Sequence, residues 1–167
     1  MPKRKRRGHG WSSVGRKRIG ADKFAIIPKT FILKGSTIPN DGLGFFLTES
    51  VKEGERICIY SGKELNKEQA EMSDSKYIVQ ISKNVFLDAR QPEYGFGKFI
   101  NCGRKSKKTI NARLGAGSTY TYHEQLDMKW ISVFSTSNIN ASVYNPVEVF
   151  IDYGTEYWSN LSGIICK

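Results

Sequence analysis

Short apolar and β-branched runs, separated by turn residues, dominate the chain from residue 24 onward. Runs of this length bounded by Gly, Asn, Asp or Pro are typical of β-strands. The candidate strands are Phe24–Ile27, Thr30–Leu33, Gly44–Leu47, Arg56–Tyr60, Tyr77–Ile81, Val85–Leu87, Lys129–Phe134 and Val147–Ile151. The pattern predicts a mainly β (α+β) fold built from several small sheets.

Helical signals are few. One segment has them clearly: Asn66 is a candidate N-cap, and Gln69 stands at the capping-box position before an Ala-Glu-Met run. We therefore expect one or two short helices. Strand–helix alternation is missing, which argues against a doubly wound nucleotide-binding fold.

The composition fits one folded domain with a charged terminus. The 167 residues are 39% hydrophobic and 12% aromatic, enough apolar material for a core. No apolar run reaches the roughly 18 residues of a membrane span, and the N-terminus does not resemble a secretory signal. We expect a soluble intracellular protein without a membrane partner.

The net charge of +10 is concentrated at the N-terminus. Residues 1–18 hold eight basic and no acidic residues; removing these eight from the 26 leaves 18 basic against 16 acidic, a net charge of +2. Interspersed Gly and Ser favour a flexible basic tail over residues 1–22. Such a run is typical of a nuclear-import signal or a nucleic-acid anchor, and a merely solubilising terminus is the alternative.

Several chemistries lack their residues. Cys58, Cys102 and Cys166 are too far apart for a CxxC zinc knuckle or a disulfide framework, and no HExxH or phosphate-binding GxxxxGK[ST] sequence is present. We predict no metal site. Only His9 and His123 could serve a histidine-dependent mechanism, and His123 is best interpreted as a surface loop residue.

Three motifs stand in a fixed order. The first combines Asp41-Gly42-Leu43-Gly44-Phe45-Phe46 with Val51-Lys52-Glu53-Gly54-Glu55 and Ile59-Tyr60-Ser61-Gly62. The second is Gly97-Lys98-Phe99-Ile100-Asn101-Cys102, followed by Asn111-Ala112-Arg113. The third is Val147-Glu148-Val149-Phe150-Ile151-Asp152-Tyr153-Gly154, followed by Glu156-Tyr157-Trp158. Together they resemble the SET-domain protein lysine methyltransferases over about residues 31–158, and specifically the minimal, viral-like type without zinc-binding flanks. The resemblance implies a SET domain over residues 23–160, a C-terminal extension over 161–167, and a C-terminal segment tucked beneath a preceding loop.

The resemblance also implies a cofactor, S-adenosylmethionine. By position, the Gly42-Leu43-Gly44 turn faces it, and these glycines leave the backbone open to a ligand. The Asn101 amide, a donor and an acceptor, suits the zwitterionic end of the cofactor. The cofactor-binding residues implied are Gly42, Leu43, Gly44, Tyr77, Asn101, Cys102 and Tyr153. The alternatives without a ligand are an ordinary β-turn at Gly42-Leu43-Gly44, a buried Asn101 that satisfies a loop, and a Tyr77 that is an ordinary strand residue.

Catalysis in such a family needs a neutral lysine amine, whereas a free lysine has a pKa near 10.4. An apolar-aromatic channel and a neighbouring sulfonium both disfavour the ammonium form. The resemblance implies that Tyr153 and Tyr60 are catalytic, and that Tyr60, Ile151 and Tyr157 line the lysine channel. For Tyr157 and Trp158 core packing is equally reasonable.

The chain departs from the family at three places. Cys102 replaces the usual His, Ile151 replaces an aromatic residue, and ten positions instead of six separate Asn101 from Asn111. The extra residues include a basic run, 104–108, which is an exposed loop or a contact to phosphates. The implied function is a protein-lysine N-methyltransferase, with a histone tail as the expected substrate, chromatin or the nucleus as the location, and a homodimer as an allowed assembly. A non-catalytic SET-like binding module or a basic nucleic-acid-binding β protein is the alternative.

Overall fold

The structure is a computed structural model, and it describes residues 28–104, 106–115, 121–123 and 128–152. Everything said below about structure refers to these residues. The basic tail, the expected strand Phe24–Ile27, the residues Tyr153, Tyr157 and Trp158, and the extension 161–167 lie outside them.

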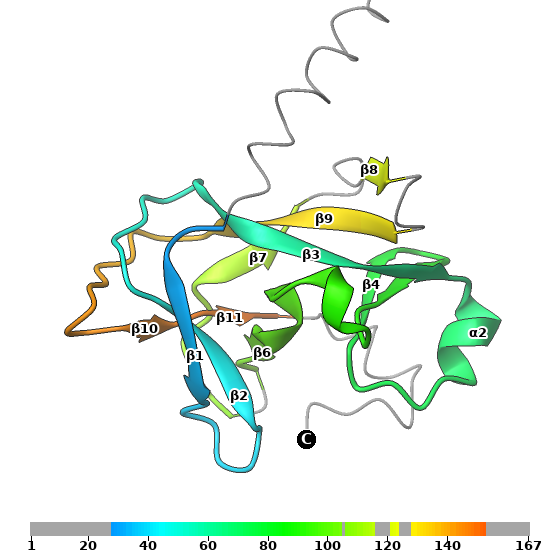
Figure 1. Ribbon diagram of the computed structural model, residues 1–167, viewed down its shortest axis with the longest axis horizontal. Helices are drawn as coiled ribbons and strands as arrows, with labels where there is room; N and C mark the ends of the chain where they lie inside the picture. The colour runs from blue at the N-terminus through cyan, green and yellow to red at the C-terminus, as the bar shows by residue number, and fades with distance from the viewer. Residues whose placement is uncertain (1–27, 105, 116–120, 124–127, 153–167) are drawn as a thin grey trace, which may run out of the picture.

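The chain folds into three small sheets with few helices, which confirms the mainly β fold (Figure 1). The largest sheet has the strand order β4-β5-β3-β9-β7, and β8 also pairs with β9. Its strands are β3 (Arg56–Leu65), β4 (Ile78–Ser82), β5 (Val85–Asp88), β7 (Ala112–Leu114), β8 (Thr121–His123) and β9 (Met128–Ser135). All the pairings in this sheet are antiparallel, and β3 with β9 forms its long centre.

Two smaller sheets hold the three sequence motifs. In the first, β1 (Phe31–Gly35) and β10 (Val147–Glu148) flank β2 (Leu43–Leu47), and both pairings are antiparallel. In the second, β6 (Asn101–Cys102) runs parallel to β11 (Phe150–Ile151). Strands distant in sequence therefore lie side by side.

The helices are short. The α-helix α2 (Lys67–Glu71) begins at Asn66 with the expected capping box: the Gln69 backbone N–H donates to Asn66 Oδ1 at 2.8 Å, and the Asn66 N–H donates to Gln69 Oε1 at 3.0 Å. Two 3₁₀ turns, η1 (Pro92–Tyr94) and η2 (Gly97–Phe99), were not expected, because a three-residue turn has no hydrophobic periodicity to reveal it.

One apolar cluster fills the space between the sheets. It includes Ile57, Cys58 and Tyr60 of β3, together with residues of β2, β5 and β9. Ile100, Val149 and Ile151 bring the second and third motifs into the same cluster. The short apolar runs seen in the sequence therefore place the motif backbones on a common core.

The segment 147–151 changes partners halfway along. Val147 and Glu148 pair with β2, the Val149 N–H still donates to Phe45 O at 2.9 Å, and Phe150 and Ile151 pair with β6. The predicted single strand is thus two strands. The segment thus leaves the sheet of β1 and β2 at Val149 and continues in the pair of β6 and β11.

The loop between β6 and β7 holds β11 from both sides (Figure 1). At one end the Gly103 N–H donates to Ile151 O at 3.1 Å, and at the other the Asn111 N–H donates to Phe150 O at 3.2 Å. The Asn111 side chain completes the grip: Oδ1 accepts from the Phe150 N–H and Nδ2 donates to Glu148 O, both at 2.8 Å. This is the tucked C-terminal segment that the resemblance implied.

One interpretation was wrong. His123 belongs to β8, opposite Met128 of β9, and not to a loop. Its polar neighbours in the sequence hid the strand, because β8 has only three residues and no apolar alternation.

Candidate functional site

The turn between β1 and β2 carries the first motif. The Ser36 N–H donates to Gly42 O at 2.8 Å and closes the turn, and the Asp41 N–H donates to Ile38 O at 3.3 Å. Asn40 and Gly42 have positive φ angles of 64° and 71°, which bend the backbone back into β2. Leu43 follows with 46% of its surface exposed, so an apolar side chain is presented to solvent at the end of the turn.

Glu148 lies behind this turn and has only 5% of its surface exposed. Its carboxylate accepts four hydrogen bonds. Oε1 accepts from Ser36 Oγ at 2.6 Å and from Asn101 Nδ2 at 3.3 Å, and Oε2 accepts from Thr37 N and Thr37 Oγ1, each at 2.7 Å. A buried carboxylate needs such partners, and here they come from the turn and from β6.

Gly44 faces the same carboxylate. A Cβ atom added there would lie 2.2 Å from Glu148 Oε1, far inside contact distance. Glycine at this position is therefore required by the close approach of Glu148, and not by a special backbone angle. The two glycines of Gly42-Leu43-Gly44 are needed for different reasons: Gly42 allows the backbone to bend, and Gly44 leaves space for the Glu148 carboxylate.

Asn101 completes the contact between the first two motifs. Its Nδ2 also donates to Leu43 O at 3.1 Å. Glu148, from the third motif, is the residue on which the turn and Asn101 converge. The structure thus brings Gly42, Leu43, Gly44 and Asn101 together around one buried carboxylate.

The local field of this site is negative. Burial, and then the nearby charge of Glu148, raise the pKa of Asp41 above its ordinary value. Within the described part of the chain, neither Asp41 nor Glu148 has an ion-pair partner among Lys and Arg. The site therefore has an excess of carboxylate over cations.

Tyr60 and Tyr77 form a second group. Tyr60 is 1% exposed, and its hydroxyl donates to Tyr77 O at 2.9 Å. The same carbonyl accepts from the Ala89 N–H at 2.9 Å. Lys98 Nζ lies 5.6 Å from the centre of the Tyr77 ring and donates to Gln91 O at 3.1 Å. Tyr60 is thus fixed in the core next to Tyr77.

Cys102 and Ile151 form a third group. They stand opposite each other in the β6–β11 pair, and both are buried. Cys58 is the other buried cysteine, and burial raises the pKa of its thiol above the ordinary value. The cysteine that replaces the family's histidine is consequently a packed core residue.

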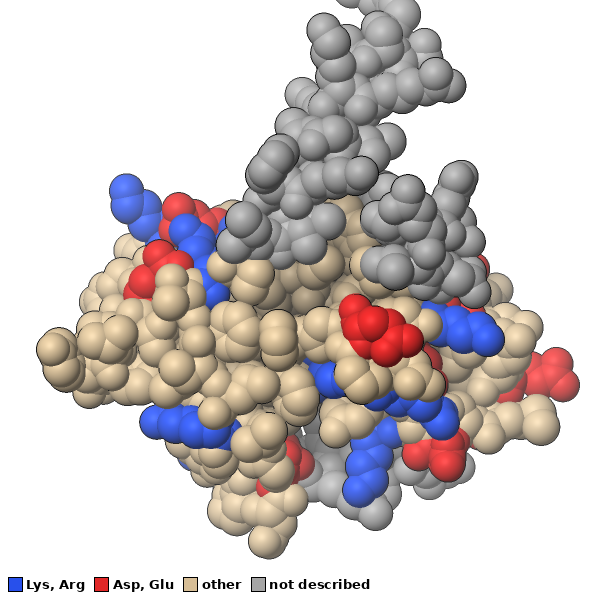
Figure 2. All heavy atoms as spheres, viewed as in Figure 1, with Lys and Arg blue, Asp and Glu red and all other residues tan. Residues whose placement is uncertain are grey.

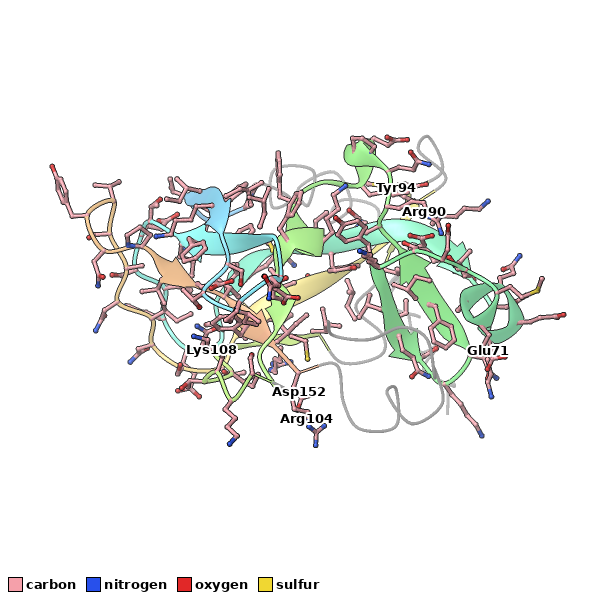
Figure 3. All side chains as sticks on the ribbon, turned by 90° about the horizontal axis from the view of Figure 1, so that it is seen from below. Glu71, Arg90, Tyr94, Arg104, Lys108 and Asp152 are labelled. Carbon is pink, nitrogen blue, oxygen red and sulfur yellow. The ribbon has the colours of Figure 1, made fainter. Side chains whose placement is uncertain are left out.

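Asp152 ends the described chain just before Tyr153. Its Oδ1 lies 3.5 Å from Arg104 Nη1, an ion pair between the C-terminal segment and the loop after β6. Figure 3 shows the two side chains close together beyond the end of β11, with Lys108 on the same loop. The ion pair therefore links the end of the described chain to the loop after β6.

A hollow of about 230 Å³ lies elsewhere, between β3 and the η1–η2 segment. Ile59, Ser61, Tyr94 and Phe96 are among its lining residues. None of the predicted site residues that the structure describes lines it. Over the same described residues, no group of His, Cys, Asp and Glu could hold a metal ion, and no helix is long and apolar enough to cross a membrane.

Surface charge over the described part is mixed. Figure 2 shows Lys and Arg as well as Asp and Glu on the face viewed, which is otherwise mostly uncharged. This agrees with the near balance of 18 basic against 16 acidic residues outside residues 1–18.

Sequence reasoning missed two residues of the site. Glu148 and Asn111 were part of the motifs but had no assigned role. A lone acidic residue in an apolar strand, at Val-Glu-Val, was the available signal, since a charge there is buried only when it is fully hydrogen-bonded. Asn111 gave no such signal, because its role depends on the contact of the β6–β7 loop with β11, two segments that lie far apart in the sequence.

Comparisons of the fold give consistent results. A candidate histone methyltransferase of Plasmodium falciparum superposes with a TM-score of 0.52 at 20% identity, covering 79% of this chain and 99% of the other. The polycomb repressive complex 2 of Chaetomium thermophilum gives a TM-score of 0.57 at 20% identity over 77% of this chain. A structure of that complex in an autoinhibited conformation, bound to S-adenosylmethionine, gives 0.56 at 20% identity over the same share.

This chain spans only 16% and 15% of the two chains from the complex. The sequence by itself matches no protein-family model and no curated protein. Identities of 20% show the shape of the backbone alone. The fold of the described residues is a SET-like fold.

Proposed function

We propose that this chain is an S-adenosylmethionine-dependent protein-lysine N-methyltransferase of the minimal type, without zinc-binding flanks, and that a histone tail is its substrate. The observation that carries the proposal is the convergence on Glu148: its carboxylate accepts hydrogen bonds from Ser36 and Thr37, at the start of the turn, and from Asn101, which also donates to Leu43 O. Three motifs far apart in sequence meet where the family resemblance implies the cofactor.

The residues present fit that cofactor. Leu43 offers an exposed apolar side chain, and Asn101 is half-exposed with a polar amide. The uncompensated carboxylates favour a ligand with a positive pole. S-adenosylmethionine supplies an activated methyl group on a sulfonium. Gly42, Leu43, Gly44 and Asn101 are the residues that would hold it, with Tyr77, Cys102 and Tyr153 as further proposed contacts.

The chain's own residues would then orient and deprotonate the lysine. Tyr60, Ile151 and Tyr157 are proposed to line an apolar channel that disfavours the ammonium form of the amine. Tyr153 is proposed to position the amine lone pair through its hydroxyl. Little acid–base machinery is needed beyond a route for the proton, which suits a chain with two histidines.

The remaining parts of the proposal concern place and partners. A basic tail with eight positive charges supports a location on chromatin or in the nucleus and contacts with nucleic acid. Polycomb repressive complex 2 is a multi-subunit assembly, which supports protein partners for this chain. A homodimer is the assembly we propose.

Incubation with core histones and S-adenosylmethionine, followed by mass spectrometry, tests the proposal. We expect methylated lysine with the unmodified protein and at least a 100-fold slower reaction with Tyr153→Phe, by analogy with the loss of one positioning group. Absence of transfer together with absence of cofactor binding would refute the enzyme. Cofactor binding without transfer to any histone would instead support a non-catalytic SET-like module.

A further inference from the structure

The hollow between β3 and the η1–η2 segment lies where the described chain begins. Pro28 is the first described residue, and it is itself one of the lining residues. We propose that this hollow is the docking site of the chain's own segment Phe24–Ile27, and that Phe24 and Ile26 face into it. The inference does not rest on the proposed function, because none of the described residues that we assign to the cofactor or to the lysine lines the hollow.

The lining of the hollow is suited to apolar side chains. Ile59 of β3, Met128 of β9 and the exposed Phe96 all contribute to it. The buried Ser61 also lines the hollow, but its hydroxyl already donates to Tyr94 O. An apolar cavity of about 150 Å³ is large enough for benzene, so the 230 Å³ of this hollow can hold an aromatic ring and part of a second side chain. Burial of apolar groups is therefore the interaction that the hollow offers.

The wall opposite β3 is fixed in place. Gly97 packs so closely on β3 that a Cβ atom there would lie 2.3 Å from Ile59 O. Phe96 is 52% exposed, yet its ring contacts the ring of Phe31, with 5.1 Å between the two centroids. An aromatic side chain that is already held in this way loses little conformational entropy when an apolar partner covers it.

The segment Phe24–Ile27 is joined directly to the lining. Its four residues are all apolar, and the sequence pattern predicts a strand there. Just after Pro28, the Lys29 N–H donates to Ile57 O at 2.8 Å, so the chain is fixed on β3 at this point. Four extended residues reach at most about 14 Å, which keeps the segment beside the hollow. Short tethers give effective concentrations in the millimolar range, and this segment therefore competes well against a separate molecule.

Strand alternation selects the two side chains that enter. The residue before a proline favours extended backbone, and successive side chains of an extended chain point to opposite faces. Phe24 and Ile26 therefore share a face with Pro28, which lines the hollow, whereas Ala25 and Ile27 are on the other face. Ile26 and Ile27 are consequently a matched pair, because they have the same side chain and only Ile26 is expected to enter.

Charge agrees with this occupant. Glu93 is an exposed residue of the lining, and within the described part of the chain no Lys or Arg forms an ion pair with it. Lys23 directly precedes the apolar segment, and residues 1–18 hold eight further basic residues. An apolar segment that follows basic residues is complementary to an apolar hollow with a carboxylate. Docking would fix the root of the basic tail on the folded domain.

Methyl NMR of the full chain, with labelled Met and Ile, tests the proposal without any substitution. We expect nuclear Overhauser contacts from the Ile26 methyl groups to the Met128 methyl or to the Phe96 ring, and no such contacts from Ile27. Met72, which is 81% exposed at the end of α2, should show none and is the internal control. Absence of contacts between Ile26 and the hollow would overturn the inference. Contacts seen only between differently labelled chains in a mixed sample would identify a second copy as the occupant and would equally overturn it.

Limited trypsin digestion of full-length variants compares the two isoleucines. Cleavage after Lys23 requires the segment to leave the hollow, and its rate follows the undocked population. We expect Ile26→Ser to speed this cleavage at least about 10-fold, because burial of an isoleucine is lost. Ile27→Ser should change it by about 2-fold or less. Cleavage after Arg18, outside the segment, is the reference and should stay constant. Equal rates after Lys23 in the two variants would overturn the inference.

Discussion

Asp41 lies on the turn between β1 and β2, and Glu148 lies behind it on β10; burial of Asp41, and then repulsion between the two carboxylates, destabilises ionised Asp41. The pKa of Asp41 is raised, so the folded state holds the proton more tightly than the unfolded state does. The stability of the protein with ionised Asp41 is therefore lower above that pKa, and the loss disappears as the pH falls to the ordinary carboxyl range, near 4.

Asp41→Asn should accordingly stabilise the protein at neutral pH. We expect the free energy of unfolding to rise by about 0.5 kcal/mol at pH 7, a modest value because the group is partly exposed and screened. Urea denaturation from pH 3 to pH 8 measures it. Asp74→Asn, which removes an ion pair with Arg90 Nη1 at 2.9 Å, should show no gain. A gain in Asp41→Asn that grew toward acid pH would contradict this account.

Gly44 and Gly35 form a matched pair for testing the close approach of Glu148. A Cβ at Gly44 would collide with the carboxylate, whereas a Cβ at Gly35 meets nothing within 4 Å. We expect Gly44→Ala to lower the free energy of unfolding by about 2 kcal/mol. Gly35→Ala should change it by about 0.5 kcal/mol or less. Equal effects in denaturation experiments would mean that the carboxylate does not constrain the backbone of β2.

At the scale of elements, the split between β10 and β11 is the feature on which the site depends. The sequence predicted the strands marked by apolar and β-branched runs, from β1 to β5 and β9, and the capped helix α2. It could not predict β6, β7 or the change of partner at Val149, because these are made by contacts between residues far apart in the sequence, such as Ala112 with Ser135 and Asn101 with Phe150. Local periodicity contains no information on such pairings.

The same limit explains the site residues. Gly42, Leu43, Gly44 and Asn101 were assigned through the family resemblance, and the structure brings them together. The role of Glu148 follows only from the structure, in which β10 pairs with β2 and the hydrogen-bond partners of Glu148 come from the turn and from β6. Tyr153 and Tyr157 lie outside the described residues, so their roles stay predictions.

Asn111 is the residue that tests the crossing of the C-terminal segment. Asn111→Ala leaves the Phe150 N–H and the Glu148 carbonyl without their partners, and we expect the free energy of unfolding to fall by about 2 to 3 kcal/mol. Asn138→Ala is the control, because Asn138 is exposed and accepts from the Glu53 N–H alone. It should cost about 1 kcal/mol or less. A similar cost for both in chemical denaturation would show that Asn111 does not fasten β11.

At the scale of the whole molecule, the basic charge and the proposed catalytic site lie in different parts of the chain. Residues 1–18 hold eight of the positive charges, and the rest of the chain is nearly balanced. If the tail contacts nucleic acid, removal of residues 2–22 should make the dependence of log K on log salt shallower by up to about 7, close to 0.9 per charge. Binding to duplex DNA at several salt concentrations measures this slope.

The domain control is the double variant Lys107→Ser/Lys108→Ser, which removes two positive charges from the loop after β6. Its slope should change by about 2 at most. A slope that is unaffected by loss of the tail, but reduced by the loop variant, would assign nucleic-acid contact to the folded domain and contradict the division of roles.

The most direct test of the central claim is transfer of a labelled methyl group. S-adenosylmethionine with a trideuterated methyl is incubated with core histones and the protein, and the histones are analysed by mass spectrometry. The account predicts a trideuteromethyl group on a lysine side chain with the unmodified protein, and only a trace with Tyr153→Phe. Absence of label from every histone lysine, under conditions in which the protein is folded, would contradict it.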